Sequence, residues 1–331
     1  MVWIQFLITS AIVVWAAIKL AEYGDVIAVR TKLGGLFVGT IFLAGATSLP
    51  EMIASISSFR LGQPDLAAGN FFGSNMVNMV LLAIVDLVNY QVPLLRRVAV
   101  SHALTAALTT ILMLVAVIFM LANISVMIGW VGIESILLIL LYFGGIWMIQ
   151  RENRGAAVVA TAVAPEPAPG FPSLRRGALG FAAAAVVLMA AVPLLVSSTA
   201  AIAVLTGLSG GFVGTALLSV VTSLPELLAA LAAVRIGAFD MAVGNLIGSS
   251  VFNMLALGFA DFFYVNGRFL GDIDDSFVLV AVLGILLTNM ALVGNLARVE
   301  RKFLFIELDA VAIIVVYLLA MYLLFLNGIG I

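Results

Sequence analysis

Ten apolar stretches follow one another along the chain, each long enough to cross a bilayer core, which takes about 20 helical residues. Hydrophobic residues make up 64% of the chain and charged residues 10%, and the mean hydropathy is +1.26. Soluble domains are about 45–50% apolar and about 25% charged. The stretches are too long and uniform for barrel strands, so we expect membrane-spanning α-helices. The predicted spans are residues 2–21, 34–59, 66–89, 99–121, 125–149, 178–204, 210–235, 239–263, 276–297 and 305–327.

The distribution of Lys and Arg predicts the orientation of these spans. The first apolar run starts at Met1 with no basic segment before it, so we interpret it as a retained span and not as a signal peptide. If the N-terminus lies outside, 13 of the 15 basic residues fall at inner loops or inner helix ends, as the positive-inside rule requires. An even number of spans then places both termini outside. The two outer basic residues are Arg60 and Arg268.

Residues 150–176 interrupt the apolar pattern and divide the chain. This segment holds four of the nine prolines, and we expect a non-helical inner linker with no folded regulatory domain. The predicted organisation is therefore a first repeat over residues 1–149, a cytoplasmic linker over 150–176 and a second repeat over 177–331.

The two halves align without a gap when position i is matched with position i+175. Between Gly35 and Asp86, 24 of the 52 positions are identical to their matched positions in the second half. Thr47-Ser48-Leu49-Pro50-Glu51 recurs as Thr222-Ser223-Leu224-Pro225-Glu226. Because each half has five predicted spans, the second half enters the membrane in the opposite sense. Inverted repeats of this kind are typical of transporters whose site lies near the bilayer midplane.

Glu51 and Glu226 are the strongest candidates for functional residues. Each lies well inside an apolar span, where an ionised carboxylate costs about 2.5–3.5 kcal/mol on insertion scales. No Lys or Arg lies at a comparable depth in the predicted spans, so the remaining partner is a mobile cation or a proton.

Oxygen-bearing side chains surround the two glutamates in the pattern. Pro50 and Pro225 lack an N–H and should break each helix, so that freed carbonyls face a cavity. Thr47 and Thr222 lie four residues before the glutamates, on the same helix face. Carboxylate, hydroxyl and amide oxygens suit hard cations such as Ca²⁺, Na⁺ and Mg²⁺. The other candidate ligands are Ser48, Ser74, Asn78, Ser223, Ser249 and Asn253.

Four further acidic residues recur at matched positions, and their roles stay open. Asp86 and Asp261 lie near predicted span ends and are expected to be interfacial. Glu134 and Asp309 lie farther inside the predicted fifth and tenth spans.

Other classes of protein fit the sequence less well. The chain has no Cys and a single His, His102, which removes thiolate and His-cluster metal sites and the usual nucleophile–base pairs, so we do not expect an enzyme. A channel with the two glutamates as a selectivity ring needs a pore, usually between symmetric subunits, and an inverted pair within one chain argues against it.

The paired motifs resemble those of the cation/calcium antiporter superfamily, in its prokaryotic sodium/calcium exchanger-like branch. The matching segments are GATSLPE (45–51) with GNFFGSNMVN (69–78), and VVTSLPE (220–226) with GNLIGSSVFN (244–253). The resemblance implies a Ca²⁺ site at Glu51, Glu226, Thr47 and Thr222. It also implies Na⁺ or other cation sites at Ser48, Ser74, Asn78, Ser223, Ser249 and Asn253, and first and sixth spans that slide over the rest.

One position departs from the family pattern. The family usually has Asp where Asn253 stands, so this site offers two carboxylates instead of three. Two negative charges balance one Ca²⁺, two Na⁺ or two H⁺, which leaves both Na⁺ and H⁺ open as counter-ion and Mg²⁺ or Mn²⁺ open as substrate. We expect a monomeric antiporter of the prokaryotic cytoplasmic membrane whose partners are the transported cations and the lipid bilayer, with no cofactor and no nucleic acid.

Overall fold

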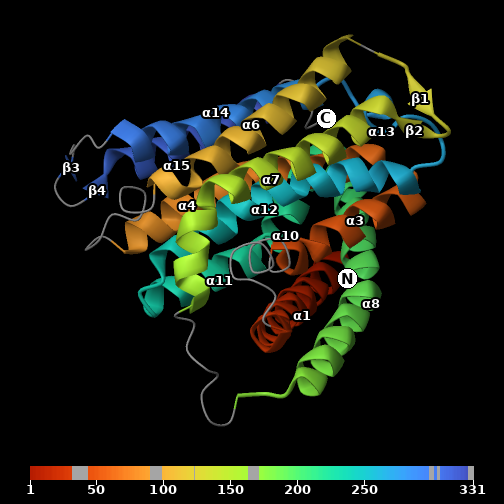
Figure 1. Ribbon diagram of the computed structural model, residues 1–331. Helices are drawn as coiled ribbons and strands as arrows, with labels where there is room; N and C mark the ends of the chain where they lie inside the picture. The colour runs from red at the N-terminus through yellow and green to blue at the C-terminus, as the bar shows by residue number, and fades with distance from the viewer. Residues whose placement is uncertain are drawn as a thin grey trace.

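The computed structural model describes residues 1–31, 44–89, 99–122, 124–162, 171–297, 302–303 and 306–326. These residues form long helices that pack along one another, with two very short hairpins at the periphery (Figure 1). The helices confirm an all-α membrane protein in outline, and the hairpins are a small correction to it. The hairpins are β1 (Met127–Ile128) with β2 (Val131–Gly132), and β3 (Lys302–Phe303) with β4 (Ile306–Glu307).

Seven helices of the described residues are long and apolar enough to cross a membrane. They are Val2–Thr31, Pro64–Val88, His102–Ala122, Ile133–Arg151, Leu174–Thr206, Gly210–Arg235 and Phe239–Phe263. Phe277–Val293 and Leu308–Leu324 are shorter apolar helices. The predicted second span begins among residues outside those described, so the count of ten stays a prediction.

The repeat seen in the sequence reappears in the bounds of the helices and strands. β1 and β2 recur as β3 and β4, and the helix that follows each hairpin starts at Ile133 in α7 (Ile133–Ala162) and at Leu308 in α15 (Leu308–Leu324). The other matched elements are α3 (Leu49–Arg60) with α11 (Leu224–Arg235), α4 (Pro64–Val88) with α12 (Phe239–Ala260) plus η2 (Asp261–Phe263), α6 (Ala99–Ala122) with α14 (Phe277–Ala297), and α1 (Val2–Thr31) with α8 (Leu174–Thr206).

The helices share two apolar cores. α1 and α8 lie side by side at one edge of the molecule (Figure 1). Their core includes Val13 and Leu20 of α1 with Leu188 and Leu195 of α8, and it reaches α3 at Ala54. A larger core joins α4, α6, α7, α12, α14 and α15. The first and sixth predicted spans are thus packed mainly on each other.

Several predicted boundaries were wrong. The fifth and tenth spans start at Ile133 and Leu308 and not near 125 and 305, because a hairpin that turns at Gly129 (φ +67°) and its counterpart occupy those residues. The first span was predicted to end near residue 21, but α1 runs to Thr31.

The linker prediction also needs correction. α7 continues to Ala162, because the Ala-rich stretch before Pro165 contains no proline that would stop it. α8 then begins at Leu174, where the Ser173 side chain caps it by accepting from the Arg176 N–H at 3.3 Å. The prolines at 165, 167 and 169 lie outside the described residues.

Candidate functional site

Each half has an interrupted helix at its TSLPE segment. Residues 44–47 are helical, Ser48 leaves the helix (φ −87°, ψ 7°) and α3 starts at Leu49. In the second half, the π-helical turn η1 (Gly214–Leu218) and α10 (Ser219–Thr222) end at Ser223 (φ −89°, ψ 0°), before α11. The predicted breaks are therefore present, two residues before Pro50 and Pro225. Both prolines sit in the first turn of the new helix, where a missing N–H costs little.

Glu51 and Glu226 come together in the interior. Each lies in the first turn after its break and is 1% exposed. The two residues share one set of hydroxyl groups, because Ser223, three residues before Glu226, donates to Glu51 Oε1 at 3.4 Å. Among the described residues, no Lys or Arg forms an ion pair with either of them. Within the described part of the chain, the two acidic groups thus lie together without a Lys or Arg beside them.

Hydroxyl groups cross from each half to the carboxylate of the other. Ser223 Oγ donates to Glu51 Oε1 at 3.4 Å, and the Thr222 hydroxyl lies nearby. Around Glu226, the Thr47 and Ser48 hydroxyls of the first half are close, although Ser48 Oγ makes no hydrogen bond. The glutamates are therefore set in a shared site built from both TSLPE segments.

Ser249 completes the surroundings of Glu226 from within the second half. Its Oγ donates to Glu226 Oε1 at 3.4 Å and lies 3.3 Å from Thr47 Oγ1. Its counterpart Ser74 is fully buried, and its hydroxyl has no partner.

Asn78 and Asn253 are buried on α4 and α12 and are held in the same manner. Asn78 Nδ2 donates to Ser250 Oγ at 3.3 Å, and Asn253 Nδ2 donates to Asn75 Oδ1 at 3.2 Å. Asn75 and Ser250 themselves occupy matched positions of the repeat. The amide nitrogens of Asn78 and Asn253 are engaged, whereas their carbonyl oxygens have no partner.

Unpartnered buried oxygens gather among these residues. Leaving such a group unsatisfied costs about 1–3 kcal/mol, more when it is charged. Among the described residues, no group of three His, Cys, Asp or Glu side chains could hold a metal, so a cation here would be bound by two carboxylates and neutral oxygens. The unpartnered atoms are Ser48 Oγ, Glu51 Oε2, Ser74 Oγ, Asn78 Oδ1, Glu226 Oε2 and Asn253 Oδ1.

Two asparagines that were not among the predicted site residues bind the backbone of the two glutamates. Asn70 Nδ2 donates to the Glu51 carbonyl at 3.0 Å, and Asn245 Nδ2 donates to the Glu226 carbonyl at 3.1 Å. Each ties α4 or α12 to the first turn of the helix that carries the glutamate. Their identity at matched positions of the repeat was the available signal.

The four other acidic residues lie apart from this site. Glu134 was expected farther inside its span but lies in the first turn of α7, directly after the hairpin. Asp309 has the equivalent place in α15. Asp86 and Asp261 lie near the ends of α4 and α12 as predicted, but they are 2% and 0% exposed, so both are buried.

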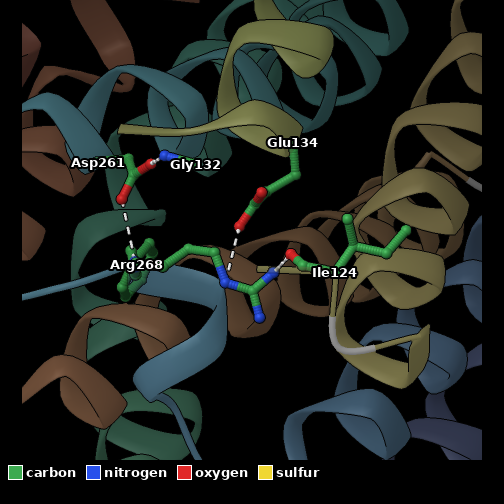
Figure 2. Close-up of polar contacts among 6 residues, drawn as sticks. Ile124, Gly132, Glu134, Asp261 and Arg268 are labelled. Atoms are coloured by element: carbon green, nitrogen blue, oxygen red, sulfur yellow. Dashed lines mark hydrogen bonds and ion pairs between the residues drawn. The ribbon is translucent and has the colours of Figure 1, made fainter. Parts of the chain in front are cut away.

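Asp261, Glu134 and Arg268 form a buried polar cluster where the end of α12, the start of α7 and the start of α13 (Phe269–Asp272) meet (Figure 2). Asp261 accepts from the backbone N–H groups of Gly132 at 2.8 Å and Phe269 at 3.0 Å. Arg268 is 7% exposed, donates to the Ile124 carbonyl and lies 3.6 Å from Glu134 Oε1. Arg268, which was predicted to lie in an outer loop, is thus a buried side chain paired with Glu134.

Comparison with known proteins adds a family to this geometry. The family model described as "Sodium/calcium exchanger protein" matches residues 1–149 and 176–326. A "Putative antiporter CaxA" from Alkalimonas amylolytica is 28% identical over 89% of the chain and 91% of its own length. "Inner membrane protein YrbG" from Escherichia coli (strain K12) is 28% identical over 74% of both chains.

Solved structures show the same fold. "Structure of native YfkE" has a TM-score of 0.68 at 15% identity and covers 97% of this chain and 92% of its own. "Crystal Structure of H+/Ca2+ Exchanger CAX" has a TM-score of 0.65 at 14% identity, with 98% and 88% covered. A structure titled as the sodium-calcium exchanger NCX_Mj with Na⁺ and Sr²⁺ has a TM-score of 0.60 at 18% identity, with 97% and 99% covered.

Proposed function

Because the chain belongs to the sodium/calcium exchanger protein family, we propose that it exchanges Ca²⁺ for Na⁺ by alternating access at the Glu51–Glu226 site. The observation that carries the proposal is the pair of buried glutamates surrounded by unpartnered oxygens from both halves. Glu51, Glu226, Thr47 and Thr222 would bind Ca²⁺. The ligands of Na⁺ would be Ser48, Ser74, Asn78, Ser223, Ser249 and Asn253.

H⁺/Ca²⁺ exchange is a second candidate, favoured by Asn253. Its carbonyl oxygen is available to a cation but carries no charge, so the site has two carboxylates. Two carboxylates neutralise one Ca²⁺ in one half-cycle and two Na⁺ or two protons in the other. A third monovalent cation would leave a net positive charge in a medium of low dielectric constant, where charge is costly.

The membrane arrangement is part of the proposal. Ten spans in two inverted halves, residues 1–149 and 177–331, would place both termini outside and the linker 150–176 in the cytoplasm. A relative named as an inner membrane protein supports placement in the cytoplasmic membrane. One chain contains both glutamates, so a monomer would be sufficient for transport.

Calcium uptake into proteoliposomes tests the proposal. We expect ⁴⁵Ca²⁺ uptake that requires an imposed Na⁺ gradient, or an H⁺ gradient if the second candidate holds. Glu51→Gln and Glu226→Gln should each abolish uptake, because one remaining carboxylate binds a divalent ion weakly. Glu22→Gln, at an exposed glutamate of α1 that pairs with Lys19, is the matched control. Uptake without a counter-ion would indicate a channel, and uptake retained by either site variant would refute the assignment.

A further inference from the structure

Matched residues of the two halves make unmatched hydrogen bonds. Thr222 Oγ1 donates to Asn70 Oδ1 at 3.1 Å. Its counterpart Thr47 bonds to Ser249 at 3.3 Å and not to Asn245, the counterpart of Asn70. Asn245 and Ser249 are four residues apart on α12, which is about one helical turn. The two threonines therefore contact positions of the opposite half that differ by one helical turn: Thr222 contacts Asn70, and Thr47 contacts Ser249, the counterpart of Ser74.

Some of the buried oxygens without partners would gain one if the two halves exchanged their hydrogen bonds. Three such atoms flank the site, and the counterpart of each one makes a hydrogen bond. The unpartnered atoms are Asn245 Oδ1, Ser48 Oγ and Ser74 Oγ. The bonded counterparts are Asn70, which accepts from Thr222, Ser223, which donates to Glu51, and Ser249, which bonds to Thr47 and Glu226.

The hydrogen bonds at the centre of the site are the same in both halves, so the difference between the halves is confined to the residues beside it. Asn78 bonds to Ser250 as Asn253 bonds to Asn75, at 3.3 and 3.2 Å. The backbone contacts also match, since Asn70 and Asn245 both donate to the carbonyl of their own half's glutamate. The threonine and serine hydroxyls of each half lie near the glutamate of the other half, and they differ only in which hydrogen bonds they make.

Building on the proposed antiport function, we propose that Asn70 and Asn245 are positioning residues that accept the opposite threonine in turn. In the opposite-facing state, Thr47 moves one turn from Ser249 to Asn245, and Thr222 moves one turn from Asn70 to Ser74. Each asparagine keeps its amide nitrogen on the glutamate carbonyl of its own half. The threonine of one half is thereby linked to the glutamate turn of the other.

The exchange leaves the same number of hydrogen bonds in both states. When two inverted halves exchange conformations, the two resulting states contain equivalent sets of contacts. An antiporter needs two states of similar free energy to complete its transport cycle. The unpartnered oxygens move from one half to the other, and their number does not change. Neither state therefore carries an additional buried polar group without a partner.

Pairs of cysteines test the exchange directly, because the natural chain contains none. The first pair is Asn70→Cys with Thr222→Cys, and the second is Thr47→Cys with Asn245→Cys. A control pair, Thr110→Cys with Asn289→Cys, replaces a similar 3.2 Å contact between α6 and α14. The full-length protein is reconstituted and treated with a short bismethanethiosulfonate reagent, under Na⁺ and Ca²⁺ gradients of each polarity.

We expect both test pairs to cross-link. Conditions that raise the cross-linking yield of the first pair should lower the yield of the second, and the yield of the control pair should stay constant. A second pair that never cross-links while the first does so in every condition would overturn the inference. Alternating yields in a protein whose wild type shows no Ca²⁺ exchange would instead refute only the proposed function.

Alanine variants give an independent measurement. Asn70→Ala and Asn245→Ala should slow exchange to a similar extent, because each removes the acceptor of a threonine in one of the two states; the loss of that one buried hydrogen bond corresponds to roughly five- to tenfold. A purely structural role predicts a larger effect at Asn70, because that side chain makes three hydrogen bonds here and Asn245 makes one. A severe loss at Asn70 with little loss at Asn245 would contradict the inference.

Discussion

At the residue scale, the charge of the site and the orientation of its amides decide which ions it can exchange. Glu51 and Glu226 supply two negative charges, and Asn253 presents a carbonyl oxygen because Asn75 holds its amide nitrogen. Asn75 Nδ2 in turn lies 3.3 Å from the sulfur of Met254, a weak acceptor. The Asn253 amide is therefore held by Asn75. The Asn75 side-chain amide can rotate by 180° at a small cost in free energy, because its nitrogen contacts only a weak acceptor.

Asn253→Asp should change the ion coupling. In this variant the new carboxylate would face Asn75 Oδ1, which cannot donate to it. If the Asn75 amide rotates by 180°, its nitrogen donates to the carboxylate and loses its contact with the Met254 sulfur. A third charge would let the site load more Na⁺ per Ca²⁺, so exchange should become more electrogenic. The reversal potential of exchange measures this directly. If activity falls while the reversal potential stays the same, Asn253 only orients its neighbours and the charge-counting argument is wrong.

The residues around the glutamates were predictable from the sequence to the extent that the repeat duplicates them. Two acidic residues in matched apolar spans pointed to Glu51 and Glu226, and hydroxyl groups of both halves link the two in the structure. Asn70 and Asn75 were missed because their partners, a backbone carbonyl and an amide from the other half, are set by packing and leave no mark in residue spacing.

At the element scale, the short breaks at Ser48 and Ser223 bring both glutamates into one site. Pro50 and Pro225 maintain the breaks because neither can donate to the carbonyl four residues back, that of Ala46 or Val221. A helix that ran through without interruption would use that carbonyl in its own hydrogen bonds, and the carbonyl could not serve as a ligand of the proposed site.

Pro50→Ala should straighten the helix and weaken transport. The restored N–H can bond to the Ala46 carbonyl across the break, and the cost of about 3 kcal/mol that a proline would have inside a continuous helix is removed. We expect calcium uptake to fall about tenfold, which is equivalent to about 1.4 kcal/mol, with normal folding by size-exclusion chromatography. Pro64→Ala is the matched control, because Pro64 begins α4 at a position where no helical hydrogen bond is lost. Equal activity of the two variants would argue against a role for the break.

The buried polar cluster of Figure 2 depends on Arg268. Arg268→Ala would leave Glu134 buried without its cation, and breaking a buried ion pair costs about 3–5 kcal/mol. The variant should unfold at a lower temperature in detergent, and adding Glu134→Gln should recover part of the loss. Arg60→Ala, at an exposed arginine, should have no effect. An unchanged melting temperature in Arg268→Ala would show that the pair contributes little.

Sequence reasoning failed at the ends of elements more than in their interiors. The hairpin at Met127–Gly132 consists mostly of apolar residues, so it was interpreted as the start of a span. Apolar runs have the same composition in a helix and in a short strand pair, and only the turn at Gly129 distinguishes them. The error moved Glu134 from the helix end to an apparent interior position.

At the scale of the whole molecule, α1 and α8 pack mainly on each other, and the core that they share extends to the helices α3, α4 and α10. They contact each other along their lengths and share an apolar core distinct from the larger one (Figure 1). The repeat makes them counterparts, one from each half, so neither half can hold this pair alone. If the first and sixth spans slide to alternate access, the packing favours movement of the two helices as one body over the site-bearing helices.

A cross-link between α1 and α8 should therefore leave transport intact. Val26 and Gly177 suit this test, because a Cβ built on Gly177 would lie 3.2 Å from that of Val26, near the range that a disulfide spans with a small shift. We expect Val26→Cys with Gly177→Cys, once oxidised, to retain Ca²⁺ uptake close to that of the reduced protein. Inhibition that reverses on reduction would mean that α1 and α8 move relative to each other. In that case each helix would slide with its own half, and the shared core would have to break and re-form in every transport cycle.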